Sequence, residues 1–142
     1  TLLFTLVNDI SMEQNWQSGN PLPMAKQAEI DPRKFTEYSM NPFNTNNQGK
    51  WQAFMILGYN IESSQGRQIA AQSIINQIRL HLENNPATLD EPSEYGIRFT
   101  VTIPIIGINY LQGTLVTKWQ IDKNKQIPRL ITNWLKINQN NG

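Results

Sequence analysis

The chain has 142 residues, the length of one ordinary domain, and folding at this length buries about 68% of the surface that the unfolded chain exposes. Its 12 Lys and Arg nearly balance its 11 Asp and Glu. The net charge of +1 excludes nucleic-acid binding driven by bulk charge and permits only a local basic patch. Without cysteine the chain has no disulfide, no thiolate nucleophile and no Cys-based zinc site.

Residues 1–30 are expected to form an N-terminal extension and linker, with residues 1–7 as an edge strand or a short helix. The apolar run at 1–7 is too short to span a membrane, and no Lys or Arg precedes it as in a signal peptide. We therefore expect a soluble protein without a membrane partner, either cytoplasmic or delivered as part of a larger protein. The first residue is Thr, which is consistent with a piece of a longer polypeptide.

The first predicted helix covers residues 33–40. Asp31 is expected to be its N-cap, and Pro32 takes the first helical position, where its missing N–H is harmless. Phe35 and Tyr38 are three residues apart and are expected to face the same way.

Two further helices are predicted, over residues 50–57 and about 65–83. Gly58 suits the end of the shorter helix, and Ser63 or Ser64 caps the longer one. Residues 87–94 are expected to form a loop that leads into the strands. The apolar positions expected to be buried are Trp51, Phe54 and Met55 or Leu57 in the shorter helix, and Ala71, Ile75, Ile78 and Leu82 in the longer one.

Three strands follow, over residues 97–103, 110–121 and 127–135, and residues 138–142 are expected to fray. Helices followed by antiparallel strands predict an α+β domain over residues 31–137, in which N-terminal helices pack on one face of a C-terminal antiparallel β-meander. Alternation places Arg98 on the solvent face of the first strand. In the second strand it assigns Leu111, Leu115, Trp119 and Ile121 to one face and Gln112, Thr114, Lys118 and Gln120 to the other.

Sequence motifs exclude several kinds of site. His81 is the single histidine, so neither a metal site nor a ribonuclease site that needs two histidines fits within the chain, and a boundary position on its helix is favoured over a catalytic role. The chain has no Gly-x-Ser-x-Gly, no phosphate-binding Gly-rich loop and no Asp-x-Asp calcium loop. We expect neither a metal nor a cofactor.

Cations on the strands are the remaining candidates for chemistry, together with Lys50 at a helix start. Arg98, Lys118 and Arg129 could hold a phosphate on a rigid sheet face, although a merely solvated face fits the same pattern. Strict alternation puts Arg129 and Thr132 on opposite faces unless a β-bulge intervenes, and Pro128 could prompt one. Core packing is expected for Trp51, Trp119 and Trp134, with base stacking as the alternative.

Matched segments between residues 31 and 135 resemble an uncharacterised bacterial domain found free-standing in cyanobacteria and at the C-termini of polymorphic toxin proteins. Its helices-then-meander layout is similar to that of barnase/EndoU/colicin/RelE-like ribonucleases, which implies metal-independent cleavage of RNA. The segments that carry the resemblance are residues 34–38, 41–42, 49–50, 54, 57–60, 95–99, 119 and 128–132.

The resemblance implies catalytic roles for Lys50, Arg98, Arg129 and Thr132, and a further, substrate-binding role for Tyr95. The strand pattern adds Lys118 as a second expected substrate-binding residue. It also implies RNA as the substrate and a cognate immunity protein or other protein as a partner. The chain departs from the family pattern at residues 44–45, 107–110 and 132–135, where it lacks a His-Pro pair, a Gly-Pro-Asn-Gly turn and a Thr-Ala-Tyr-Pro end. These departures remove a candidate general base and a tyrosyl hydroxyl. A non-catalytic module that binds protein or nucleic acid is therefore the alternative.

Overall fold

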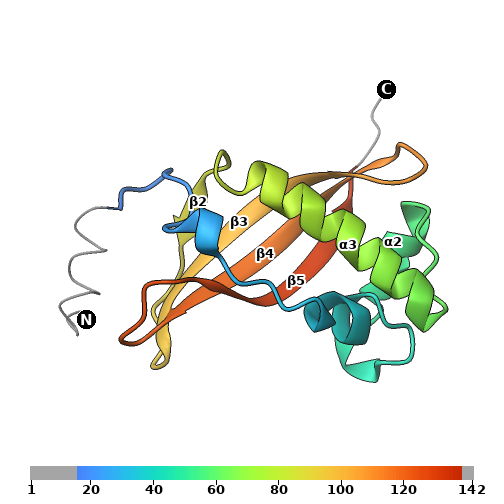
Figure 1. Ribbon diagram of the computed structural model, residues 1–142, viewed down its shortest axis with the longest axis horizontal. Coiled ribbons are helices and arrows are strands. Elements are labelled where there is room, and N and C mark those ends of the chain that lie inside the picture. The colour runs from blue at the N-terminus through green and yellow to red at the C-terminus, as the bar shows by residue number, and fades with distance from the viewer. Residues whose placement is uncertain (1–15, 139–142) are drawn as a thin grey trace.

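The computed structural model of the chain describes residues 16–138, so the element expected at residues 1–7 and most of the expected frayed tail lie outside it. The chain forms helices first and then a four-stranded antiparallel sheet in the order β2-β3-β4-β5 (Figure 1). The predicted α+β class, with helices on one face of a C-terminal meander, is confirmed. The strands are β2 (Ala87–Leu89), β3 (Gly96–Ile106), β4 (Gln112–Asp122) and β5 (Arg129–Ile137).

Strand β2 corrects the predicted loop at residues 87–94, because Ala87–Leu89 is a strand in the structure. Ala87 pairs with Val101 and Leu89 with Phe99, so the segment adds a short fourth strand beside β3. Only three residues pair, too few to show an alternating pattern in the sequence.

The long helix α3 (Ser64–His81) lies across one face of the sheet, and α2 (Trp51–Ile56) lies at its end beside β5 (Figure 1). Ser63 caps α3 as predicted, and its Oγ accepts a hydrogen bond of 2.9 Å from the N–H of Gly66. The short helical turns are η1 (Ala25–Gln27), η2 (Lys34–Ser39) and η3 (Thr45–Asn47).

The first predicted helix is a π-helical turn, η2, and not an α-helix. The N–H of Met40 donates to the carbonyl of Phe35 at 2.9 Å, five residues back, and this wider winding separates residues that an α-helix would align. Phe35 is fully buried, whereas Tyr38 is only partly buried and bonds Lys50. The prediction that Phe35 and Tyr38 face the same way is therefore wrong.

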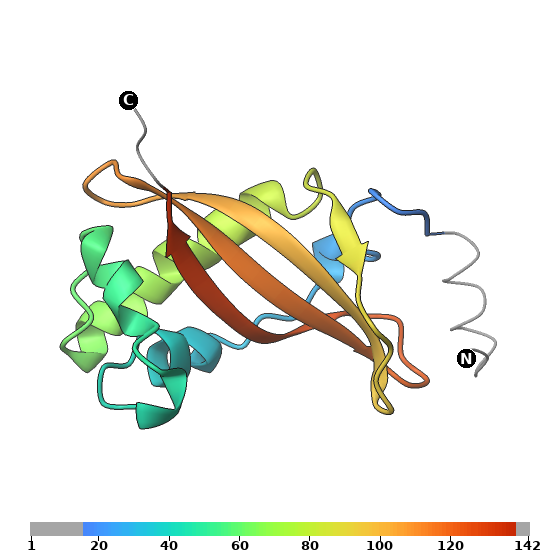
Figure 2. The same cartoon turned by 180° about the vertical axis from the view of Figure 1, so that it is seen from behind.

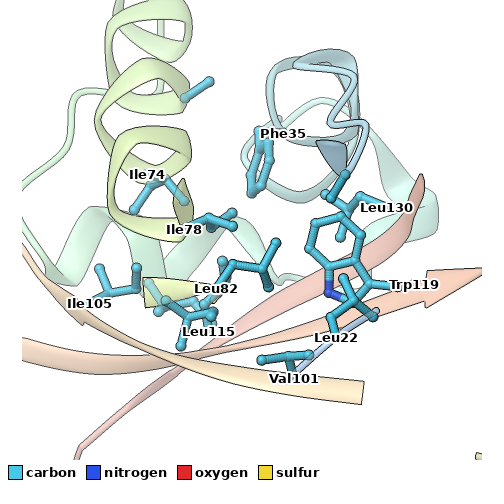
Figure 3. Packing of buried hydrophobic residues seen from close by; sticks show 14 of the residues in the cluster. Leu22, Phe35, Ile74, Ile78, Leu82, Val101, Ile105, Leu115, Trp119 and Leu130 are labelled. Atoms are coloured by element: carbon cyan, nitrogen blue, oxygen red, sulfur yellow. The ribbon is translucent and has the colours of Figure 1, made fainter. Parts of the chain in front are cut away.

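The core lies between α3 and the sheet (Figure 3). Ile74 and Ile78 of α3 and Trp119 of β4 are fully buried, and Leu115 and Ile121 confirm the predicted apolar face of β4. Leu111 lies before β4 and is exposed, which corrects its assignment to that face. In the short helix Phe54 and Leu57 are buried as expected, while Trp51 is partly buried.

Residues from Leu22 to Ala28 also contribute to the core, although they belong to the segment expected as a linker. Leu22 and Ala28 are buried, and Trp16 meets Phe99 edge to face with ring centroids 5.1 Å apart. The N–H of Leu130 donates to the carbonyl of Glu29 at 2.9 Å, so this segment also fixes the start of β5. The domain boundary at residue 31 stays a prediction.

The opposite face of the sheet carries no helix within residues 16–138 (Figure 2). None of the helices in that range has the length and apolar character needed to cross a membrane. The cross-strand polar and aromatic side chains on this open face are the candidates for function.

Thr117 is a buried polar residue on the core face of β4. Its hydroxyl donates to the carbonyl of Val101 at 2.6 Å and accepts the indole N–H of Trp119 at 2.7 Å. Thr117→Val keeps the shape but leaves that indole N–H without an acceptor, so we expect a loss of about 1–3 kcal/mol in the free energy of unfolding. Chemical denaturation measures this loss. The matched control Thr102→Val, at an exposed position of β3, should change stability by less than about 0.5 kcal/mol, and equal effects of the two variants would contradict the assignment.

Candidate functional site

The ladder between β4 and β5 contains a β-bulge at Ile131. Lys118 pairs with Thr132 and Trp119 with Leu130, so Ile131 is an extra residue without an opposite partner. The bulge keeps Leu130 in the core and turns both Arg129 and Thr132 to the open face. The bulge anticipated from the alternation conflict is confirmed, but it lies three residues beyond Pro128.

Two cross-strand rows result on the open face. In the first row Arg98 of β3 is opposite Gln120 of β4, which is opposite Arg129 of β5. Directly opposite residues in such rows have Cβ atoms about 4.5–5.5 Å apart, so these side chains are close enough to interact. The second row consists of Thr100, Lys118 and Thr132.

Arg98 and Arg129 share a surface hollow with Tyr95, which is 62% exposed in the loop before β3. Three of the residues singled out from the sequence therefore meet at one place. The other residues that line this hollow are Glu94, Gln120, Asp122, Lys123 and Ile131.

The side chains of the two arginines are held by hydrogen bonds to Gln120 and Asp122 of β4. Nε of Arg129 donates to Oδ2 of Asp122 at 2.9 Å, and Nη2 donates to Oδ1 at 3.2 Å. Nε of Arg98 donates to Oε1 of Gln120 at 2.8 Å, and the amide of Gln120 donates to the same Asp122 carboxylate. This chain of bonds fixes both guanidinium groups before any ligand arrives.

The ion pair shifts the protonation of both partners. Hydrogen bonds from Arg129 lower the pKa of Asp122 below its ordinary value, against a smaller opposing effect of burial, and the amide of Gln120 lowers it further. The Asp122 carboxylate in turn raises the pKa of Arg129. Both groups are therefore charged at neutral pH.

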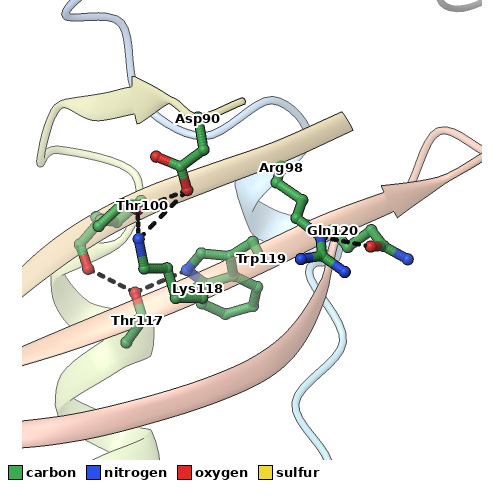
Figure 4. A network of polar contacts seen from close by, with 8 residues as sticks. Asp90, Arg98, Thr100, Thr117, Lys118, Trp119 and Gln120 are labelled. Carbon is green, nitrogen blue, oxygen red and sulfur yellow. Dashed lines mark hydrogen bonds and ion pairs between the residues drawn. The ribbon is translucent and has the colours of Figure 1, made fainter. Parts of the chain in front are cut away.

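Lys118 lies on the predicted solvent side of β4, between Thr100 and Asp90 (Figure 4). Its Nζ donates to Oγ1 of Thr100 at 2.7 Å and lies 3.5 Å from Oδ2 of Asp90. Thr100 also donates to Asp90 at 2.7 Å, so the lysine, the threonine and the carboxylate hold one another.

Lys50 does not join Arg98 and Arg129 in their hollow. Its Nζ donates to the hydroxyl of Tyr38 at 2.8 Å and lies 5.5 Å from the ring centroid of Trp134. Thr132 borders a second hollow, which shares Ile131 with the first. The second hollow is lined by Asp31, Arg33, Lys34, Glu37, Tyr38, Ile131 and Thr132.

Trp134 was expected in the core, and the structure corrects this. It lies on β5 two residues beyond Thr132, on the same open face, and is only partly buried. Because side chains alternate along the strand after the bulge, Trp134 points to the same open face as Thr132. Tyr38 and Asp122 were also missed, because their roles depend on side-chain contacts with other elements: Tyr38 of η2 bonds Lys50, and Asp122 at the end of β4 bonds Arg129 at the start of β5.

Acid and base groups near the arginines are carboxylates and a phenol, and not an imidazole. His81 is the last residue of α3, which covers the other face of the sheet, and it is partly buried as the boundary assignment implied. Across residues 16–138 no three His, Asp or Glu side chains are grouped so that they could hold a metal ion. Proton transfer at the first hollow would therefore use Tyr95, Glu94 or Asp122.

The family model described as Domain of unknown function (DUF6883) matches residues 21–136 of the chain. No curated protein and no solved structure matches the chain.

The Asp122–Arg129 ion pair predicts a pH-dependent contribution to stability. Because the pKa of Asp122 is lower in the folded state, the contribution is present above the ordinary Asp pKa and is lost as the pH falls through the folded value. Asp122→Asn should lower the stability at pH 7 by at most about 1 kcal/mol, since the pair is partly exposed, and this difference should shrink toward pH 3. Denaturation at both pH values measures it, with Glu94→Gln as a control on a carboxylate of the same hollow that forms no ion pair within residues 16–138. A difference that is the same at both pH values would contradict the pairing.

Proposed function

The chain belongs to the DUF6883 family of domains of unknown function, and we propose that it binds RNA on the open face of its sheet. The observation that carries the proposal is the convergence of Arg98 and Arg129, from two strands that are not neighbours, on one hollow with Tyr95. A phosphodiester is the ligand whose charge and oxygens this arrangement matches. Guanidinium groups present paired N–H donors that fit two phosphate oxygens at once.

The electrostatics favour an anion at this point. Within residues 16–138 no carboxylate lies within ion-pair distance of Arg98, whereas Arg129 is already paired with Asp122. Arg98 is therefore the stronger phosphate ligand, and Arg129 shares its charge between Asp122 and the ligand. With a net charge of +1, binding depends on these few contacts and has a shallow salt dependence.

A finer proposal is metal-independent cleavage of the bound RNA, as the resemblance to ribonucleases implies. In this reaction the 2′-oxygen attacks the adjacent phosphorus, the bond to the 5′-oxygen breaks, and Arg98 and Arg129 stabilise the extra negative charge on the phosphate. The carboxylate of Glu94 takes the proton of the 2′-hydroxyl, and the phenol of Tyr95 gives its proton to the departing 5′-oxygen. Thr132 orients a phosphate oxygen. Lys50 contributes only when the RNA extends past Thr132 to Trp134.

If the chain is a non-catalytic module, its alternative ligand is a protein. An immunity protein is one such ligand, because the resemblance includes toxin domains. The β3–β4 hairpin favours such a partner. Tyr110 at its tip is 84% exposed, and Asn109 joins the hairpin to α2 through a 2.9 Å bond to the carbonyl of Ile56. The exposed apolar side chains around this tip are Ile56, Ile106, Ile108, Tyr110 and Leu111.

RNA binding can be tested by titrating a labelled single-stranded RNA and following its fluorescence anisotropy. Arg98→Gln should weaken binding about tenfold, because a charge-assisted bond to a phosphate is lost, and Arg98→Lys should recover part of that loss. Lys26→Gln removes the same charge from η1, on the α3 side of the sheet, and should leave binding unchanged (Figure 1). Equal weakening by Arg98→Gln and Lys26→Gln would show that the open face is not the binding site.

Cleavage can be tested on bulk RNA in the presence of a chelator. The wild-type chain should shorten the RNA, and Arg129→Ala should reduce the rate by about 100-fold or more, as expected for a donor to the transition state. Lys50→Ala should reduce the rate on long RNA and have little effect on a dinucleotide that cannot reach Trp134. Intact RNA at high protein concentration, under conditions where it binds, would exclude the ribonuclease and leave the binding module.

A further inference from the structure

We infer that Trp134 is a nucleobase-stacking site on the open face, so that the RNA bound there is unpaired. The inference rests on the proposed function and adds the class of ligand. Trp134 is a large aromatic residue of β5 and is partly exposed. No helix of the described chain crosses this face of the sheet (Figure 2). An indole that meets solvent among polar neighbours offers a flat apolar surface on which any base can stack.

The distance from Trp134 to the arginines suits a short strand of RNA. Trp134 pairs with Val116, and Arg129 pairs with Gln120, four residues away on β4. Four residues of a β-strand span about 13 Å, which is close to the length of four stacked nucleotides at about 3.4 Å each. A single strand held at Arg98 and Arg129 can thus place a base about four nucleotides further along on the indole.

Two ammonium groups lie beside this ring. Nζ of Lys50 is 5.5 Å and Nζ of Lys118 is 6.0 Å from its centroid. Each is attracted to the indole, yet the two charges repel each other, and within the described residues Lys50 has no carboxylate at ion-pair distance. Lys50 is held instead by the hydroxyl of Tyr38.

An anion near the indole would relieve this repulsion. A nucleotide supplies both parts of the match, because its base covers the aromatic surface while its phosphate meets the ammonium groups. A purely apolar ligand would leave Lys50 without a counter-ion, because the carboxylate of Asp90 pairs only with Lys118. Inorganic phosphate would leave the indole uncovered. Duplex RNA keeps its bases stacked inside the helix and cannot use the ring.

A structural role for Trp134 is the competing explanation, since the ring neighbours Val116, which is 5% exposed on the same face. If the ring only covers Val116, its removal would affect folding, and the chain would bind RNA with bases and RNA with abasic sites equally well. The two explanations therefore separate in binding experiments that compare RNA with and without bases.

The experiment measures binding of a six-nucleotide single-stranded RNA, the same backbone with abasic sites, and the corresponding duplex. The wild-type chain should bind the base-bearing strand about tenfold more tightly than the abasic strand, as one stacked base predicts. Trp134→Leu should abolish this preference and keep the abasic affinity, whereas Trp134→Phe should retain most of it. Trp16→Leu removes a tryptophan that packs on Phe99 in the core and should keep the preference.

The outcomes are separable. Equal binding of the base-bearing and abasic strands by the wild-type chain overturns the stacking site and leaves phosphate binding at Arg98 and Arg129 intact. A preference that survives in Trp134→Leu also overturns it. Failure of every oligonucleotide to bind overturns the proposed function itself. If Trp134→Leu fails to fold, binding of the base-bearing and abasic strands can still be compared in the wild-type chain and in Trp134→Phe. That comparison still tests whether Trp134 stacks a base.

Discussion

The register shift between β4 and β5 is the constraint on which the candidate site depends. Ile131 is an extra residue that has no partner on β4. Without it, a regular ladder would place either Arg129 or Thr132 against the core. A buried unpaired guanidinium is too costly to survive, so the strand yields by a bulge instead. The backbone bonds between Glu29 and the start of β5 hold the strand in place next to this irregularity.

The two faces of the sheet differ in character, one apolar and packed in the core and the other polar and charged. One face joins α3 in an apolar core, where Thr117 and Trp119 satisfy each other and the carbonyl of Val101. The other face carries charged side chains that are tied to Gln120, Asp122 and Asp90, so their directions are set by the fold. Held in this way, Arg98 and Arg129 would lose little freedom on binding the proposed phosphate, which would favour recognition despite the low net charge.

Much of this architecture is readable from local patterns. The alternation in β3 and β4, the Ser63 cap and the outward directions of Arg98 and Lys118 all follow from short-range rules, and the conflict between Arg129 and Thr132 signals the bulge. What escapes is set by distant contacts or weak signals: the three-residue β2, the π-helical winding of η2 and the bond between Tyr38 and Lys50. Trp134 was misassigned because bulk apolar character suggested a core position when its place after the bulge indicated the open face.

We propose that RNA binds the open face of the sheet and no other surface. A titration of the isotopically labelled chain with a short single-stranded RNA, followed by NMR, tests it through side-chain N–H signals. RNA on the open face should shift the Nε–H signals of Arg98 and Arg129 and the indole N–H signal of Trp134, while the signal of the buried Trp119 indole stays unchanged. Shifts confined to α3 or to the β3–β4 hairpin would contradict it.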